Sequence, residues 1–109
     1  MYNLTKNEEF ILISIWKLKD QAYGISIMED FRKITGKTLN YGSMYNTLFQ
    51  LLKKGYIASR QSLPLSKRGG RRKVMYSLTS EGEKALSHTR KIQKRAWENV
   101  TDFSFEEKK

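Results

Sequence analysis

The sequence predicts an α+β fold that is mostly helical, with three short helices, a two-stranded hairpin and a longer final helix. Three observations predict this order. First, apolar residues recur at helical spacing in three successive segments. Second, two β-rich segments flank a Gly-Gly turn. Third, a motif typical of a helix start precedes a last segment with few apolar positions. At 109 residues with a single proline, the chain is long enough for one core.

The first two helices are predicted over about residues 6–19 and 25–34. Thr5 and Glu8 have the spacing of a capping box, in which each side chain bonds to the other residue's backbone N–H. The first helix is apolar on most sides, which is more than one core face requires, so we expect it to pack against a second subunit as well. Gly36 is expected to end the second helix in a left-handed C-cap.

The third helix is predicted over about residues 41–54, with Asn40 as its N-cap. Its core side has apolar residues at i, i + 4 and i + 7, namely Met44, Leu48 and Leu51. Its opposite face is polar and carries Ser43, Asn46, Thr47, Gln50 and Lys53, with Tyr45 at the edge. Such side chains hydrogen-bond base edges, and a tyrosine can donate to a phosphate. An ordinary solvated helix face is the competing interpretation.

The hairpin is predicted from strands over residues 56–61 and 73–78, joined by a basic tip that contains Gly69 and Gly70. The basic residues on or beside this tip are Lys67, Arg68, Arg71, Arg72 and Lys73. Glycines allow close backbone approach, and guanidinium groups neutralise phosphates or enter a narrow minor groove. A charged turn that serves solubility is the competing interpretation.

The last helix is predicted to start with a capping box from Ser80 to Glu83 and to continue to about Val100. Its apolar stripe is too thin to form a core and is better suited to a partner helix. We expect the tail, residues 102–109, to be polar and frayed.

Charge is distributed unevenly along the chain. The net charge is +10, yet from Phe31 to Ser80 there are eleven Lys or Arg residues and no Asp or Glu. A block of one sign favours a polyanionic partner, with nucleic acid preferred over the competing acidic membrane surface. No segment is long and apolar enough to predict a membrane span, and no signal peptide is indicated, so we expect a soluble cytoplasmic protein.

An enzymatic function is not indicated. The chain has no cysteine, a single histidine (His88), no Gly-rich phosphate loop, no metal-ligand spacing and no nucleophile–base pair. We therefore expect neither a cofactor nor a metal.

Three helices followed by a hairpin form the winged helix-turn-helix arrangement, in which the second helix of the motif enters the major groove. Several motifs add to it in order and spacing: Tyr23-Gly24-Ile25, Asn40-Tyr-Gly-Ser-Met-Tyr45, Lys54-Gly-Tyr-Ile57, Gly69-Gly-Arg-Arg-Lys73 and Tyr76-Ser-Leu-Thr79. Over about residues 5–90 the chain resembles the PadR family of bacterial transcriptional regulators, in its smaller subgroup with a single C-terminal helix.

The resemblance implies a homodimeric repressor that meets a palindromic operator in double-stranded DNA. It implies a winged helix-turn-helix domain over residues 1–79 and a dimerisation helix over residues 80–101. By position, the recognition-helix contacts would be Ser43, Tyr45, Asn46 and Thr47, and Arg71 and Lys73 would match the basic residues of the wing. The chain departs from the family at Arg72, where proline is frequent, and at Met75, where a second aromatic is frequent.

Some small members of the family bind flat aromatic drugs between tryptophans at the dimer interface. Trp97 lies on the corresponding helix, about one turn later than expected, and Trp16 could face the same region. The competing interpretation is that both tryptophans belong to the dimer core. A winged-helix interaction module that binds protein or RNA is the alternative to the repressor.

Overall fold

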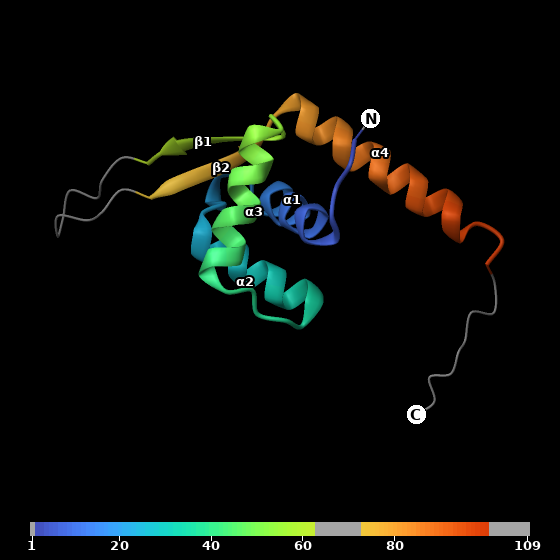
Figure 1. Ribbon diagram of the computed structural model, residues 1–109, viewed down its shortest axis with the longest axis horizontal. Coiled ribbons are helices and arrows are strands. Elements are labelled where there is room, and N and C mark those ends of the chain that lie inside the picture. The colour runs from blue at the N-terminus through green and yellow to red at the C-terminus, as the bar shows by residue number, and fades with distance from the viewer. Residues whose placement is uncertain (1, 63–72, 101–109) are drawn as a thin grey trace.

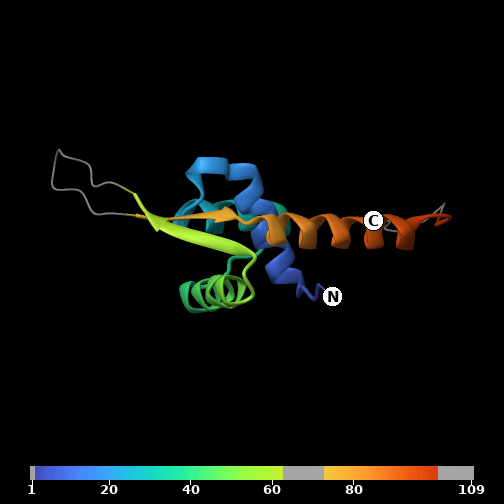
Figure 2. The ribbon, with the colours of Figure 1, turned by 90° about the horizontal axis from the view of Figure 1, so that it is seen from above.

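The computed structural model describes residues 2–62 and 73–100 and has the expected order of elements (Figure 1). The elements are α1 (Lys6–Leu18), the 3₁₀ turn η1 (Lys19–Gln21), α2 (Gly24–Thr35), α3 (Tyr41–Lys53), β1 (Ile57–Gln61), β2 (Val74–Leu78) and α4 (Ser80–Trp97). The hairpin and α4 extend from the body of the three short helices in opposite directions (Figures 1 and 2). The winged-helix prediction for the fold is therefore confirmed.

The starts and ends of the first two helices follow the predicted caps. The Thr5 hydroxyl accepts from the Glu8 N–H at 3.0 Å, and Glu8 Oε1 accepts from the Thr5 N–H at 3.0 Å, so the capping box is present. Helix α2 ends at Gly36, whose φ of 76° is the left-handed conformation that glycine adopts at low cost. Both predicted caps are thus confirmed.

The hydrophobic core lies where α1, α2, α3, the hairpin and the first turns of α4 meet. Its largest fully buried apolar side chains are Ile11, Leu12, Ile15, Ile27, Met44, Leu48 and Leu51. Helix α1 supplies three of them, which agrees with the apolar character of this helix in the sequence. The core also includes Ala85, at the start of α4.

The hairpin is antiparallel, with a register from Ile57 opposite Leu78 to Gln61 opposite Val74. Its inner strand is tied to the helical body, because the Tyr76 N–H donates to the Ala22 carbonyl at 2.8 Å. The hairpin therefore has a fixed position relative to the segment that precedes α2.

The N-cap of helix α4 lies one residue before the predicted one. The N-cap is Thr79, whose hydroxyl accepts from the Gly82 N–H at 3.1 Å, so the predicted capping box from Ser80 to Glu83 is wrong. A tertiary contact explains the choice, since the Thr79 hydroxyl also donates to the Gly55 carbonyl at 2.6 Å. The helix ends at Trp97 rather than near Val100, because the chain turns there and Asn99 has a positive φ of 65°.

A glycine allows α4 to start directly against the backbone that precedes β1. A Cβ atom on Gly82 would overlap the backbone carbonyl of Tyr56, which immediately follows the α3–β1 turn. In addition, the Thr79 N–H donates to this same carbonyl at 3.0 Å. The first turn of α4 is therefore held close to the backbone at the start of β1.

Within the two described ranges, no helix combines the length and the apolar character needed to cross a membrane.

Candidate nucleic-acid interface

Helix α3 is oriented by its N-cap and by its apolar side. Asn40 Oδ1 accepts from the Ser43 N–H at 2.8 Å, as the sequence predicts for an N-cap. The three predicted core residues, Met44, Leu48 and Leu51, are buried. Because a helix turns by about 100° per residue, this burial directs the opposite face of α3 to solvent.

The structure brings the predicted recognition residues together on this helix, with differences between them. Four of the predicted side chains are exposed: Ser43, Tyr45, Asn46 and Lys53. Thr47 and Gln50 are half-buried at the border of the face. The Thr47 hydroxyl donates to the Ser43 carbonyl at 2.9 Å, so this hydroxyl already has a partner within the helix.

Tyr45 leans toward the start of α2. A Cβ atom on Gly24 would collide with the Tyr45 hydroxyl, and the Tyr45 ring stacks with Tyr41 at 6.4 Å between centroids. Burial raises the pKa of Tyr76 above its usual value, and the phenolate form of the neighbouring Tyr45 adds to this effect. Tyr45 is nevertheless 47% exposed and can still reach a ligand at the edge of α3.

Phe49 is a candidate interface residue that the sequence interpretation missed. Its ring is 55% exposed, and it lies on the outer face of α3 at i + 3 from Asn46 and i − 4 from Lys53. The Lys53 ammonium lies 5.6 Å from the centre of the ring. Helical spacing alone places Phe49 on this face, so the sequence contains the information needed to predict it. The predicted recognition residues were polar or tyrosine, and Phe49 is apolar.

The base of the wing is described, but its tip is not. The Ser62 N–H donates to the Lys73 carbonyl at 2.7 Å and the Lys73 N–H to the Ser62 hydroxyl at 3.0 Å, which extends the hairpin toward the tip. The Lys73 ammonium lies 4.0 Å from the centre of the Tyr23 ring. The other four predicted wing residues lie outside the described residues: Lys67, Arg68, Arg71 and Arg72.

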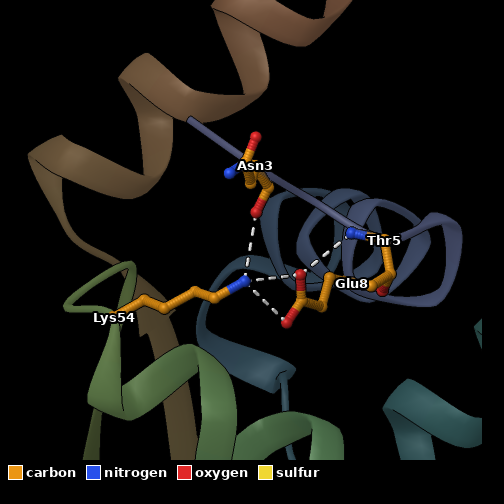
Figure 3. A network of polar contacts seen from close by, with 4 residues as sticks. All are labelled: Asn3, Thr5, Glu8 and Lys54. Atoms are coloured by element: carbon orange, nitrogen blue, oxygen red, sulfur yellow. Dashed lines mark hydrogen bonds and ion pairs between the residues drawn. The ribbon is translucent and has the colours of Figure 1, made fainter. Parts of the chain in front are cut away.

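A polar network holds the C-terminal end of α3 against the N-terminal end of α1 (Figure 3). The Lys54 ammonium lies 2.9 and 3.0 Å from the two carboxylate oxygens of Glu8, and it donates to the Asn3 carbonyl at 3.1 Å. The Glu8 side chain is only 7% exposed. The carboxylate that caps α1 therefore also fixes the position of α3.

A separate cavity of about 580 Å³ lies between α1 and α4. Its lining includes Trp16 and Ile13 from α1, and Leu86, Arg90 and Gln93 from α4. Trp97 is not part of the lining, so the structure of one chain does not bring the two predicted tryptophans to the same cavity. The buried Glu9 at its edge accepts from Gln93 Nε2 at 2.9 Å.

Within residues 2–62 and 73–100, no three His, Cys, Asp or Glu side chains are grouped so that they could hold a metal ion.

A helix with a solvent-facing polar side, next to a two-stranded hairpin and inside an acid-free block of sequence, defines the winged-helix class of DNA-binding proteins. The model of the transcriptional regulator PadR-like family matches residues 12–88. The chain therefore belongs to the PadR-like family and is a DNA-binding transcriptional regulator. The class is regulatory and not enzymatic.

Solved structures with the same fold come from diverse organisms. A PadR family transcription regulator from Clostridium difficile is 30% identical, with a TM-score of 0.62 and coverage of 85% of this chain and 88% of that chain. A PadR-like transcription factor from Bacteroides fragilis is 21% identical, with a TM-score of 0.71 and coverage of 90% and 89%. A protein from Thermoplasma acidophilum is 23% identical, with a TM-score of 0.69 and coverage of 87% and 86%. No curated protein matches the sequence.

Proposed function

We propose that this chain is a homodimeric repressor, acting in the cytoplasm, that binds a palindromic operator in double-stranded DNA. The observation that carries the proposal is the outer face of α3, where exposed Ser43, Asn46 and Lys53 project from a helix whose other side is buried in the core. Residues 1–79 then form the DNA-binding domain, and residues 80–101 form the dimerisation helix, followed by a polar tail over residues 102–109.

The two parts of the interface have different tasks in this proposal. The side chains of α3 read base edges in the major groove: Ser43, Tyr45, Asn46, Thr47, Gln50 and Lys53. The basic residues of the wing bind the phosphate backbone or enter the minor groove. These residues are Lys67, Arg68, Arg71, Arg72 and Lys73. Phosphate contacts supply affinity that falls with salt, whereas base contacts supply the choice of site.

The second half of α4 supports the proposed dimer. It extends beyond the three short helices (Figure 1). Its apolar residues Ile92 and Trp97, and Val100 just after its end, are between 44% and 56% exposed in the single chain. Trp16 of α1 is likewise exposed. A second copy that covers these residues would remove apolar surface from water, which favours association.

The cavity between α1 and α4 supports a further proposal, an aromatic small-molecule effector. Trp16 and Leu86 offer an apolar lining, and a volume of about 580 Å³ is in the range of small-molecule sites. The competing role for Trp16 and Trp97 is that of dimer core. Titration with planar cationic aromatics tests the effector, because unchanged tryptophan fluorescence and melting temperature would contradict it.

Fluorescence anisotropy tests the proposed operator binding, with DNA from upstream of the chain's own gene, random duplex of equal length and two salt concentrations. We expect the upstream DNA to compete much better than random duplex. Asn46→Ala should weaken binding to the operator and change its base preference, by about 1–3 kcal/mol at the affected base pair. Arg71→Ala should instead weaken binding to every duplex and lower the salt slope.

Equal affinity for any duplex would contradict the proposed repressor. The alternative, a winged-helix module that binds protein or RNA, predicts that replacing Asn46 and Thr47 leaves partner binding unchanged. The same variants therefore separate the two functions.

A further inference from the structure

The exposed side of α3 combines one aromatic ring with polar neighbours. Asn46, Phe49 and Lys53 follow one another at i, i + 3 and i + 7, so they lie on the same face, opposite the buried Met44, Leu48 and Leu51. Single exposed apolar side chains are common on protein surfaces and need no explanation by themselves. Phe49 differs because it lies on the face that would enter the major groove, one turn before Lys53.

The surroundings of Phe49 favour a polyanion over an apolar protein surface as its partner. Lys53 holds its ammonium 5.6 Å from the ring, and no Asp or Glu occurs in the sequence from Phe31 to Ser80. An apolar partner surface would have to desolvate Lys53 together with the ring, which is costly. DNA offers a phosphate for the ammonium and a groove for the ring at the same time.

The other aromatic residues of α3 are less suited to this task. Tyr45 leans toward Gly24 at the start of α2, and Tyr41 stacks against Tyr45. These contacts draw Tyr45 and Tyr41 toward α2. Phe49 lies one turn beyond Tyr45, with the Lys53 ammonium beside its ring.

The chemistry of the major groove limits what a phenyl ring can recognise there. The edges of adenine, guanine and cytosine present hydrogen-bond donors and acceptors, and thymine adds a C5-methyl group. A ring against donors and acceptors would strip them of water without replacing their hydrogen bonds, and this is unfavourable. A ring against the methyl group removes apolar surface from water on both sides.

We propose that Phe49 packs on the C5-methyl group of a thymine in each operator half-site and so makes α3 select thymine at that position. The proposal rests on the proposed operator binding, and it adds an apolar contact to the hydrogen bonds of Asn46.

The test begins with selection of binding sites from a randomised duplex library by the wild-type chain and by Phe49→Ala. Because Phe49 is exposed, the variant should keep the wild-type circular dichroism spectrum and melting temperature. We expect a position in each half-site where the wild type strongly prefers thymine and Phe49→Ala does not. Phe49→Leu, which keeps an apolar side chain, should retain part of the preference.

The decisive measurement replaces this thymine by uracil, which removes only the methyl group. For the wild type, affinity should fall about threefold to fivefold per half-site, as expected for one buried methyl group. Phe49→Ala should bind the thymine and uracil operators equally. Asn46→Ala serves as the matched control: its affinity is lower, but its sensitivity to uracil should equal that of the wild type.

The outcomes separate this inference from the proposed function. Two results would overturn the inference and leave the repressor intact. In the first, the wild type and Phe49→Ala enrich operators with the same thymine preference. In the second, uracil lowers the affinity of the wild type and of Phe49→Ala equally. If the wild type enriches no sequence at all, the proposed operator binding fails, and the inference fails with it.

Discussion

Asp30 connects α2 to α1 through both of its carboxylate oxygens. Oδ2 accepts from the Ser14 hydroxyl at 2.7 Å, and Oδ1 lies 3.1 Å from the Lys17 ammonium. Burial by itself would raise the pKa of Asp30, but the hydrogen bonds from Ser14 and Lys17, with the charges of Lys17 and Lys33, outweigh it and hold this pKa below its usual value. Ser14 is fully buried, so Asp30 also satisfies a hydroxyl that water does not reach.

In the Asp30→Asn variant, the free energy of unfolding should therefore change less with pH in the acidic range than in the wild type. A carboxylate with a lowered folded-state pKa stabilises the fold above its unfolded-state pKa of about 3.9, and this contribution is lost as pH falls through the folded-state value. Near neutral pH we expect a loss of about 1–2 kcal/mol in the free energy of unfolding. Below the folded-state pKa the difference from the wild type should shrink.

Urea denaturation from pH 7 to pH 3 measures this difference. Asp20→Asn is the matched control, because Asp20 is an exposed carboxylate in η1. A constant difference between wild type and Asp30→Asn over this range would contradict the assigned role of the charge.

At the scale of elements, two neighbouring carboxylates of α1 serve different parts of the fold. Glu8 binds Lys54 at the end of α3, and Glu9 accepts from Gln93 of α4. Helix α1 is thus connected by polar contacts to the candidate recognition helix on one side and to the candidate dimerisation helix on the other.

Lys54→Met should lower the free energy of unfolding by about 1–3 kcal/mol, because it leaves the buried Glu8 carboxylate without its cation. Since Lys54 is partly exposed, this loss should stay below that of a fully buried ion pair. The double variant Glu8→Gln with Lys54→Met should recover part of this loss. Lys84→Met is the matched control, since its pair with Glu81 is exposed on both sides and should contribute almost nothing. Equal losses for the two lysine variants, measured by urea denaturation, would contradict the assignment.

Hydrophobic periodicity and helix caps predict most of the elements. The caps at Thr5, Gly36 and Asn40 can be predicted because each of them bonds only to residues of its own helix. The N-cap of α4 could not be predicted in this way. Thr79 and Ser80 both offer a hydroxyl, and the choice depends on the Gly55 carbonyl, which is distant in sequence. The same limit applies to the site: the outer face of α3 follows from spacing, but the cavity beside Trp16 requires the packing of α4 on α1.

At the scale of the whole molecule, the exposed apolar residues of α4 predict the oligomeric state. Ile92→Lys should place a charge in the proposed interface and shift the chain from dimer to monomer. Light scattering coupled to size-exclusion chromatography measures the mass, and circular dichroism checks that the fold is kept. Ile25→Lys on α2 is the matched control, because Ile25 is 53% exposed and Ile92 is 45% exposed.

A dimer of unchanged mass for Ile92→Lys would contradict the proposed interface, as would loss of the dimer in both variants, since that would indicate a general effect of added charge.

The close approach of Gly82 to the Tyr56 carbonyl has a geometric consequence for a twofold dimer. Because α4 starts against the backbone between α3 and β1, the direction in which α4 leaves the body is set at this contact. In a pair joined through α4, the same contact would set the distance and angle between the two copies of α3. The number of base pairs between operator half-sites would then depend on Gly82, a residue outside both α3 and the wing.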